Sequence, residues 1–180
     1  MLKNTPNGYG WVSIALHWVM ALALLGLFGL GLYMVELTYY DPWYRQSLNW
    51  HKSIGILLAV TWLVRVLWRL SNTTPGVIAD KRWQVLAAHA AHWLLYLLML
   101  ALFVSGYLIS TADGREIDVF GWFSVPATVT GDNQEDWAGE VHEWLAWSII
   151  ALIVVHAAAA IKHHVIDGDD TLKRMFRVKK

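Results

Sequence analysis

The sequence of 180 residues contains no cysteine, and only 16% of its residues are charged. Without cysteine the chain has no disulfide bonds and no cysteine-ligated iron–sulfur cluster. The charged fraction is well below the roughly 25% of an ordinary soluble domain. Hydrophobic residues make up 57% of the chain, so its composition is typical of a membrane protein and we expect no nucleic-acid partner.

Four long apolar segments occupy most of the chain, at about residues 11–35, 48–70, 83–110 and 137–164. Each is near the ~20 residues that a helix needs to cross a bilayer, and the first is too long for a signal peptide. Turn-rich segments with proline and aspartate separate them. We therefore predict an all-α fold, an integral membrane four-helix bundle that forms a single domain over residues 1–180.

The basic residues are distributed unequally between the two predicted sides of the membrane. The side of the termini collects 11 of the 14 basic residues: Lys3, Arg65, Arg69, Lys81, Arg82, Lys162, Lys173, Arg174, Arg177, Lys179 and Lys180. The other side holds 10 of the 14 acidic residues: Glu36, Asp41, Asp113, Glu116, Asp118, Asp132, Glu135, Asp136, Glu140 and Glu143. Basic loops stay in the cytoplasm, so we expect both termini to be cytoplasmic.

Two histidines of the last apolar segment, His142 and His156, are 14 residues apart. In an α-helix this spacing leaves both imidazoles on one face, about 21 Å apart along the axis. That offset suits two haems stacked in one bilayer, each with an axial ligand from the same helix. Ionisable side chains at membrane depth are rare and usually functional. Because the C-x-x-C-H attachment motif is absent, such haems would be b-type.

The remaining histidines sort by their depth in the predicted helices. His51 shares the outer level with His142, so these two form one candidate axial pair. His156 shares the inner level with His17, His89 and His92, and the spacing alone does not decide which of them faces it. His163 and His164 lie at the end of the last predicted helix, at the inner interface.

Each histidine also has a plainer interpretation as a packing residue, because intramembrane histidines are often only hydrogen-bonded. His-rich metal transporters are a non-redox alternative, but they usually show discontinuous helices and internal repeats, and this chain shows neither. Gly26, Gly29, Gly55 and Gly106 give space either for haem faces or for close helix contact.

Several motifs together resemble one family. They are Ser13–Trp18, Asn49–Gly55 with Arg65 and Arg69, Ala88–His92 with Tyr96 and Gly106, His142-Glu143, His156–Ala160 with His163-His164, and Asp170–Met175. This pattern is similar to the bacterial cytochrome b561 family of four-helix dihaem membrane proteins. The resemblance covers nearly the whole chain.

The resemblance implies a specific ligand set. His17 and His156 would hold the inner haem b, and His51 and His142 the outer one, with His89 and His92 outside the ligand set. Haem propionates need cations, for which Lys52 is a candidate at the outer haem and Arg65 and Arg69 at the inner one. His163, His164 and His92 are candidates for a quinone site that needs a proton donor.

The resemblance also implies a function at the bacterial inner membrane. Some members look like superoxide oxidases, which pass an electron from periplasmic superoxide through both haems to ubiquinone. The alternatives are a carrier between quinol and a periplasmic redox protein, and the cytochrome b subunit of a larger dehydrogenase. Beyond the haem edges we expect no catalytic residue, because two axial imidazoles leave iron no open position. Superoxide is an anion, so the acidic outer loops argue against it unless Lys52 and Arg115 form a local positive funnel.

Overall fold

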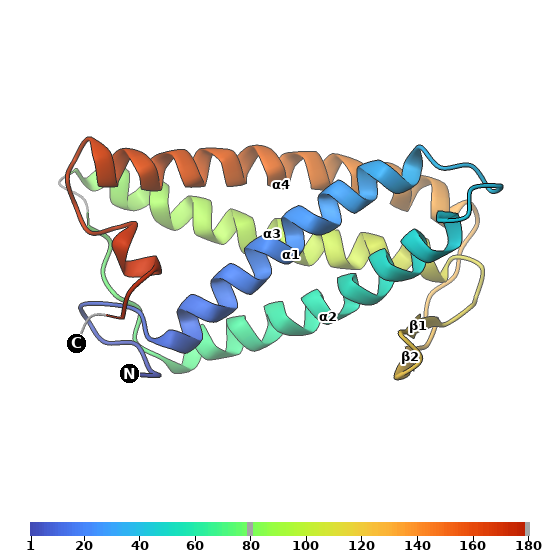
Figure 1. Ribbon diagram of the computed structural model, residues 1–180, viewed down its shortest axis with the longest axis horizontal. Coiled ribbons are helices and arrows are strands. Elements are labelled where there is room, and N and C mark those ends of the chain that lie inside the picture. Colours follow the sequence, from blue (N-terminus) through green and yellow to red (C-terminus); the bar gives the residue numbers. More distant parts are fainter. Residues whose placement is uncertain (79–80, 179–180) are drawn as a thin grey trace. The chain divides into compact units, whose positions relative to one another are not determined.

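Helices dominate the computed structural model, which describes residues 1–78 and 81–178. The four long helices are α1 (Trp11–Val35), α2 (Tyr44–Ser71), α3 (Arg82–Thr111) and α4 (Gln134–Val165) (Figure 1). Each is long and apolar enough to cross a membrane. The prediction of an all-α membrane fold with four spanning helices is confirmed.

Two helices begin earlier than hydropathy predicts, because their first turns are polar. α2 begins at Tyr44 rather than near Leu48, and the amide of Ser47 already donates to the Trp43 carbonyl over 2.9 Å. α4 begins at Gln134, whose side-chain amide donates to the carbonyls of Leu108 (2.8 Å) and Val129 (3.2 Å). Acidic side chains in the first turn of α4 also favour the positive end of the helix dipole.

The helices expose many large apolar side chains along their length. Leu22, Val60, Trp93 and Val154 are each more than half exposed. Apolar patches of this extent do not face water in soluble monomers, whereas lipid tails cover them in a membrane protein. The exposure therefore agrees with the composition.

The chain divides into two compact units, and each of the four helices contributes a segment to both. Unit 1 comprises Met1–Val19, Trp62–Leu98 and Ser148–Lys180, and unit 2 comprises Met20–Thr61 and Met99–Trp147. The single-domain organisation and the cytoplasmic position of the termini stay predictions. Lys179 and Lys180, which contributed to the expected orientation, lie outside the described residues.

In unit 1, the segments that flank the helices are fixed by specific hydrogen bonds. The side-chain oxygen of Asn4 accepts from the Gly10 amide (2.9 Å) and from the Ser13 hydroxyl (2.7 Å) at the start of α1. The indole N–H of Trp18 donates to the carbonyl of Met175 over 2.7 Å, next to the 3-10 helix Lys173–Met175. The C-terminal segment is thereby held against α1, one residue from His17.

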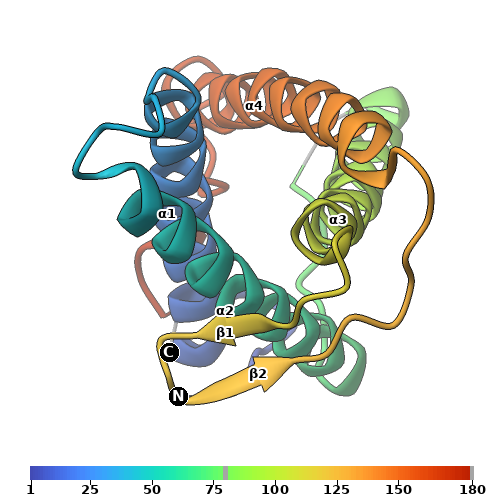
Figure 2. The same cartoon turned by 90° about the vertical axis from the view of Figure 1, so that its right-hand side faces the viewer.

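In unit 2, the loop before α4 contains a β-hairpin that the sequence analysis did not predict. β1 (Ile117–Val119) pairs antiparallel with β2 (Phe123–Val125), and the turn places both Phe120 and Gly121 at positive φ, 53° and 71°. The hairpin lies beside α2 (Figure 2). There the fully buried Ser53 donates to the Asp118 carbonyl (3.2 Å) and accepts from the Phe120 amide (3.3 Å).

We expect Ser53→Ala to loosen the hairpin, because the Phe120 amide and the Asp118 carbonyl lose a buried partner. Each such loss costs about 1–3 kcal/mol. Hydrogen exchange of β1 and β2 should rise while the four helices stay protected. Ser47→Ala is the matched control, since Ser47 is also buried on α2 but its hydroxyl donates to the Tyr44 carbonyl of the same segment. Equal exchange in both variants would contradict the anchoring role.

Candidate functional site

Two pairs of histidine rings face each other, one pair in each unit. In unit 2, His51 of α2 and His142 of α4 have ring centres 6.3 Å apart, with planes at 70°. In unit 1, His17 of α1 and His156 of α4 also have ring centres 6.3 Å apart, with planes at 64°. The two pairs that the family resemblance implies as axial ligands are therefore brought together.

The ring separation can be compared with that of imidazoles on one metal ion. A metal–nitrogen bond is about 2 Å, and each nitrogen lies about 1 Å from its ring centre, so two opposed imidazoles have centres about 6 Å apart. Both observed separations match this value. Direct stacking or hydrogen bonding of two imidazoles would bring the rings closer, so the spacing fits an iron atom between them.

His142 is oriented by a second set of contacts in unit 2. Its Nδ1 lies 3.1 Å from the Leu102 carbonyl oxygen and 3.0 Å from the Ser105 hydroxyl. A carbonyl only accepts, so Nδ1 carries the proton and Nε2 carries the lone pair that a metal needs. Metal-bound histidines typically donate their other ring N–H to such an acceptor, which fixes the tautomer and the ring orientation.

Glycines make room for both rings of the unit 2 pair. A Cβ atom on Gly106 would lie 3.0 Å from Cε1 of His142, and one on Gly31 would lie 3.4 Å from Cε1 of His51. The missing side chain at Gly106 thus makes room for the imidazole ring of His142. The sequence analysis missed Gly31, because a glycine in an apolar helix carries no signal of what it faces. Positions 26, 29 and 55, also singled out as glycines, have no neighbour within 4 Å of an added Cβ.

Nδ1 of His51 is buried and has no hydrogen-bond partner among the residues that the structure describes. A buried polar nitrogen without a partner is costly, so such an atom in a native protein calls for an explanation. A haem group beside His51 would change the surroundings of this ring, and the orphaned nitrogen is consistent with one.

The unit 1 pair has a third histidine beside it. His92 of α3 lies with its ring centre 5.4 Å from that of His156, and His89 on the same helix is exposed. His156 therefore has two histidine neighbours, at 6.3 Å and at 5.4 Å. The ambiguity that the sequence left at this level is visible in the structure.

Two arginines of α2 lie in unit 1 and are held by the neighbouring helices. Arg65 donates from Nε to the Tyr96 hydroxyl (3.3 Å) and from Nη1 to the Ser13 carbonyl (3.4 Å). The guanidinium of Arg69 lies 5.6 Å from the centre of the Tyr96 ring. Neither contact involves a carboxylate, so both positive charges remain available to an anionic group.

The cations of unit 2 are less available. Arg115 forms an ion pair with Asp113, and its Nε donates to that carboxylate over 2.6 Å. Hydrogen bonds from Arg115 lower the pKa of Asp113 below its ordinary value, so the carboxylate stays charged. Lys52 is half-buried beside His51 and interacts electrostatically with both Asp113 and Arg115. Of the two residues expected to form a positive funnel, only Lys52 lacks a carboxylate ion pair among the described residues.

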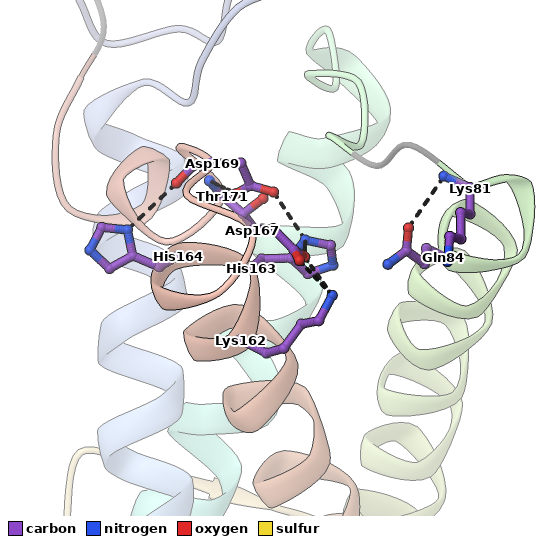
Figure 3. A network of polar contacts seen from close by, with 8 residues as sticks. All are labelled: Lys81, Gln84, Lys162, His163, His164, Asp167, Asp169 and Thr171. Carbon is purple, nitrogen blue, oxygen red and sulfur yellow. Dashed lines mark hydrogen bonds and ion pairs between the residues drawn. The ribbon is translucent and has the colours of Figure 1, made fainter.

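The end of α4 places His163 and His164 in different surroundings (Figure 3). His163 lines a cavity of about 200 Å³ together with Ile78, Lys81, Gln84, Lys162, Asp167 and Asp169. His164 instead lies with Nδ1 3.5 Å from the Asp169 carbonyl oxygen. Of the three histidines proposed for a quinone, His163 is thus the one at this cavity.

Comparison with known proteins identifies the family of the chain. The family model described as prokaryotic cytochrome b561 matches residues 8–177. Cytochrome b561 homolog 2 of Escherichia coli K12 is 54% identical over 174 residues, which are 96% of this chain and 93% of that protein. A probable superoxide oxidase CybB of Yersinia pestis is 30% identical over 96% of this chain and 97% of its own length. Cytochrome b561 homolog 1 of E. coli K12 is 27% identical over 97% and 99% of the two chains.

The match covers all four helices and both histidine pairs, and 54% identity over nearly the full length of a relative leaves no doubt about common descent. The chain therefore belongs to the prokaryotic cytochrome b561 family, bacterial membrane proteins that bind b-type haem and transfer electrons.

Proposed function

We propose that the chain is a dihaem electron carrier, with His17 and His156 as axial ligands of one haem b and His51 and His142 as those of the other. The equal ring separation of 6.3 Å in the two pairs is the observation that carries the proposal. Each pair joins two different helices, so the two imidazoles of a pair could hold a haem between those helices. Bound haem would supply the one-electron redox centres.

The ring separations also support His17 over His92 as the partner of His156. Opposed imidazoles on one iron need centres about 6 Å apart, and the 5.4 Å between His92 and His156 is shorter. His92 fits better as a neighbour that borders the haem site. The family resemblance leads to the same assignment.

The surrounding cations suit the carboxylates of the haem side chains. We assign Arg65 and Arg69 to the propionates of the His17–His156 haem, because Tyr96 holds both guanidinium groups without neutralising them. Lys52 takes the corresponding role beside His51. An arginine inside a membrane is costly unless it meets a negative charge, and a propionate would provide that charge.

The ligand set limits the chemistry to electron transfer. With two imidazoles as ligands, the iron would have no open position for a substrate, so a bound haem would supply electron transfer at its edge. The chain's own residues contribute by holding the imidazoles neutral and oriented, as the Leu102 carbonyl does for His142. The proposed ligand set therefore argues against an oxygen-activating enzyme.

We further propose that the electron donor is superoxide, that the acceptor is ubiquinone, and that both termini are cytoplasmic. A relative that is 30% identical is named a probable superoxide oxidase, which supports the donor. The cavity beside His163 supports a quinone head group there, because Lys81, Gln84 and the imidazole offer hydrogen bonds to its oxygens. His164 and His92 are second choices, since neither lines this cavity.

A periplasmic redox protein as the partner is the second candidate, and one contact favours it. Because Asp113 neutralises Arg115, the loop between α3 and α4 offers little positive charge to attract superoxide. The same loop and the start of α4 carry several acids, which suit a basic partner. The experiments below separate the two candidates.

The ligand assignment predicts both the haem content and the pairing of the ligands. The purified chain should contain two haem b, measured by the pyridine haemochrome assay. His51→Ala and His142→Ala should lose the same haem, and His17→Ala and His156→Ala the other, because bis-imidazole ligation needs both partners. The exposed His89 supplies the control His89→Ala, which should keep two.

The variant His92→Ala separates the two possible partners of His156. It should keep both haems, while His17→Ala loses one. One haem per chain in the unaltered protein, or loss of a haem in His92→Ala with retention in His17→Ala, would contradict the ligand assignment.

The next prediction concerns Ser105. Its hydroxyl accepts from Nδ1 of His142, which would raise the basicity of this imidazole as a ligand and favour ferric iron in a bound haem. Ser105→Ala should therefore raise the midpoint potential of the His51–His142 haem, on the order of tens of millivolts. The His17–His156 haem of the same protein is the internal control in the redox titration. Equal shifts of both haems, or none, would show that Ser105 does not act through His142.

Another prediction concerns the donor. Superoxide should reduce the haems within the mixing time of a stopped-flow experiment, and ubiquinone should reoxidise them. Lys52→Met should slow the reduction, whereas Asp113→Asn should accelerate it because Arg115 is released. Higher salt should weaken both effects. Asp132→Asn is the matched control, since it removes the same charge from the same loop.

Two results would argue against this donor. If superoxide leaves both haems oxidised while a basic c-type cytochrome exchanges electrons with them, the second candidate is correct. If Asp113→Asn and Asp132→Asn accelerate the reaction equally, the ion pair with Arg115 has no specific role.

A further inference from the structure

A cluster of polar side chains at the end of α4 is not needed for haem binding. Nδ1 of His163 lies 3.0 Å from Oδ2 of Asp167 and 3.0 Å from Oδ2 of Asp169. The three atoms all lie within 4.8 Å of one another. The side chains of His163 and Asp169 are largely buried, at 19% and 16% exposure, so the cluster is not an ordinary surface charge pair.

The imidazole of His163 cannot serve both carboxylates of the cluster at once, and the Lys162 ammonium group is the other donor to Asp167. A neutral imidazole carries one proton, so Nδ1 can donate fully to only one of the two carboxylates at a time. The two anionic oxygens nevertheless converge on this one nitrogen (Figure 3). A cation at the point of convergence would satisfy all three atoms at once.

We propose that His163, Asp167 and Asp169 form a binding site for a divalent transition-metal cation, of which Zn²⁺ fits the donor set best. One imidazole nitrogen with two carboxylates suits zinc, whereas Mg²⁺ and Ca²⁺ prefer oxygen donors alone. In a tetrahedral zinc site with bonds of about 2.0–2.1 Å, the ligand atoms lie about 3.3 Å apart. The two nitrogen–oxygen distances of 3.0 Å need to change by only a few tenths of an ångström.

The backbone fixes the ligands in this arrangement without the metal. The helix ends in a tight turn in which the amide of Asp167 donates to the Lys162 carbonyl (3.2 Å), and Gly168 follows at a φ of 70°. The amide of Asp169 then returns to the His163 carbonyl (3.1 Å). The Thr171 amide donates to Oδ1 of Asp169 (2.7 Å), which leaves Oδ2 for a ligand.

Lys162 would compete with a metal ion for the carboxylate of Asp167. Its ammonium group lies 2.8 and 2.6 Å from the two carboxylate oxygens of Asp167. A cation already occupies one side of the cluster, so a metal ion must share Asp167 with this ammonium group or displace it. Removal of the lysine charge should then strengthen metal binding. If the cluster were only a salt-bridge network, the same change would disrupt it and would not improve metal binding.

The proposed metal site and the proposed quinone site use different atoms of His163. The metal binds Nδ1, and Nε2 stays available to a quinone. Metal binding can be measured without a quinone or a donor, so failure of one proposal leaves the other open to its own test.

The test is equilibrium dialysis of the detergent-solubilised holoprotein, without a polyhistidine tag, against Zn²⁺ in a chelator buffer, with elemental analysis. We expect one zinc per chain, and millimolar Mg²⁺ should not displace it. Asp167→Asn and Asp169→Asn should each weaken binding at least tenfold. His164→Ala is the matched control, since it removes the adjacent imidazole, and it should bind as the unaltered chain does. Lys162→Met should bind more tightly.

A second measurement guards against misfolding. The haem spectrum of each variant should be unchanged, and Zn²⁺ should raise the melting temperature of the unaltered chain but not of Asp169→Asn. Absence of stoichiometric zinc, or equal binding by the unaltered chain and both asparagine variants, would overturn the proposal. So would weaker binding in Lys162→Met.

Discussion

The pairing of imidazole rings between facing helices is the constraint on which the rest of the structure depends. A histidine in an apolar helix is expensive unless it has a partner, and here each of four histidines has another ring at a fixed distance. Other features follow from this requirement. Gly31 and Gly106 leave space for the rings of His51 and His142. The Leu102 carbonyl and the Ser105 hydroxyl fix the orientation of the His142 ring through its Nδ1. Little of the remaining helix surface is specific, because lipid accepts any apolar side chain.

Much of this could be predicted from the sequence because membrane helices obey strong and simple rules. Length and hydropathy locate the spans, and the 14-residue interval between His142 and His156 follows from helix geometry alone. The partner of His156 could not be chosen in this way, because His17 and His92 lie at similar depths on different helices. That choice depends on how the helices rotate about their own axes, which apolar residues on all sides do not determine.

Other features could not be predicted because their sequence signals are weak. The hairpin turn requires positive φ at Phe120, whereas such turns favour asparagine or glycine, so only Gly121 marked it. The cluster of His163, Asp167 and Asp169 exists because the chain reverses at Gly168, and the spacing of the three residues belongs to no common metal motif. Ser53 and Ser105 are serines inside helices, and nothing in their immediate sequence distinguishes a buried anchor from a residue that hydrogen-bonds its own helix.

The position of both pairs on α4 has a consequence for biogenesis. His142 and His156 are the only members of the two pairs that share a helix, and this helix is synthesised after α1, α2 and α3. A nascent chain that ends at Thr111 already contains His17 and His51, but each of these rings still lacks its opposite ring. Neither of the two proposed ligand pairs is complete before α4 enters the membrane. Under the proposed ligand assignment, haem insertion would depend on the synthesis of α4, and a truncated product with only the first three helices would retain neither proposed redox centre.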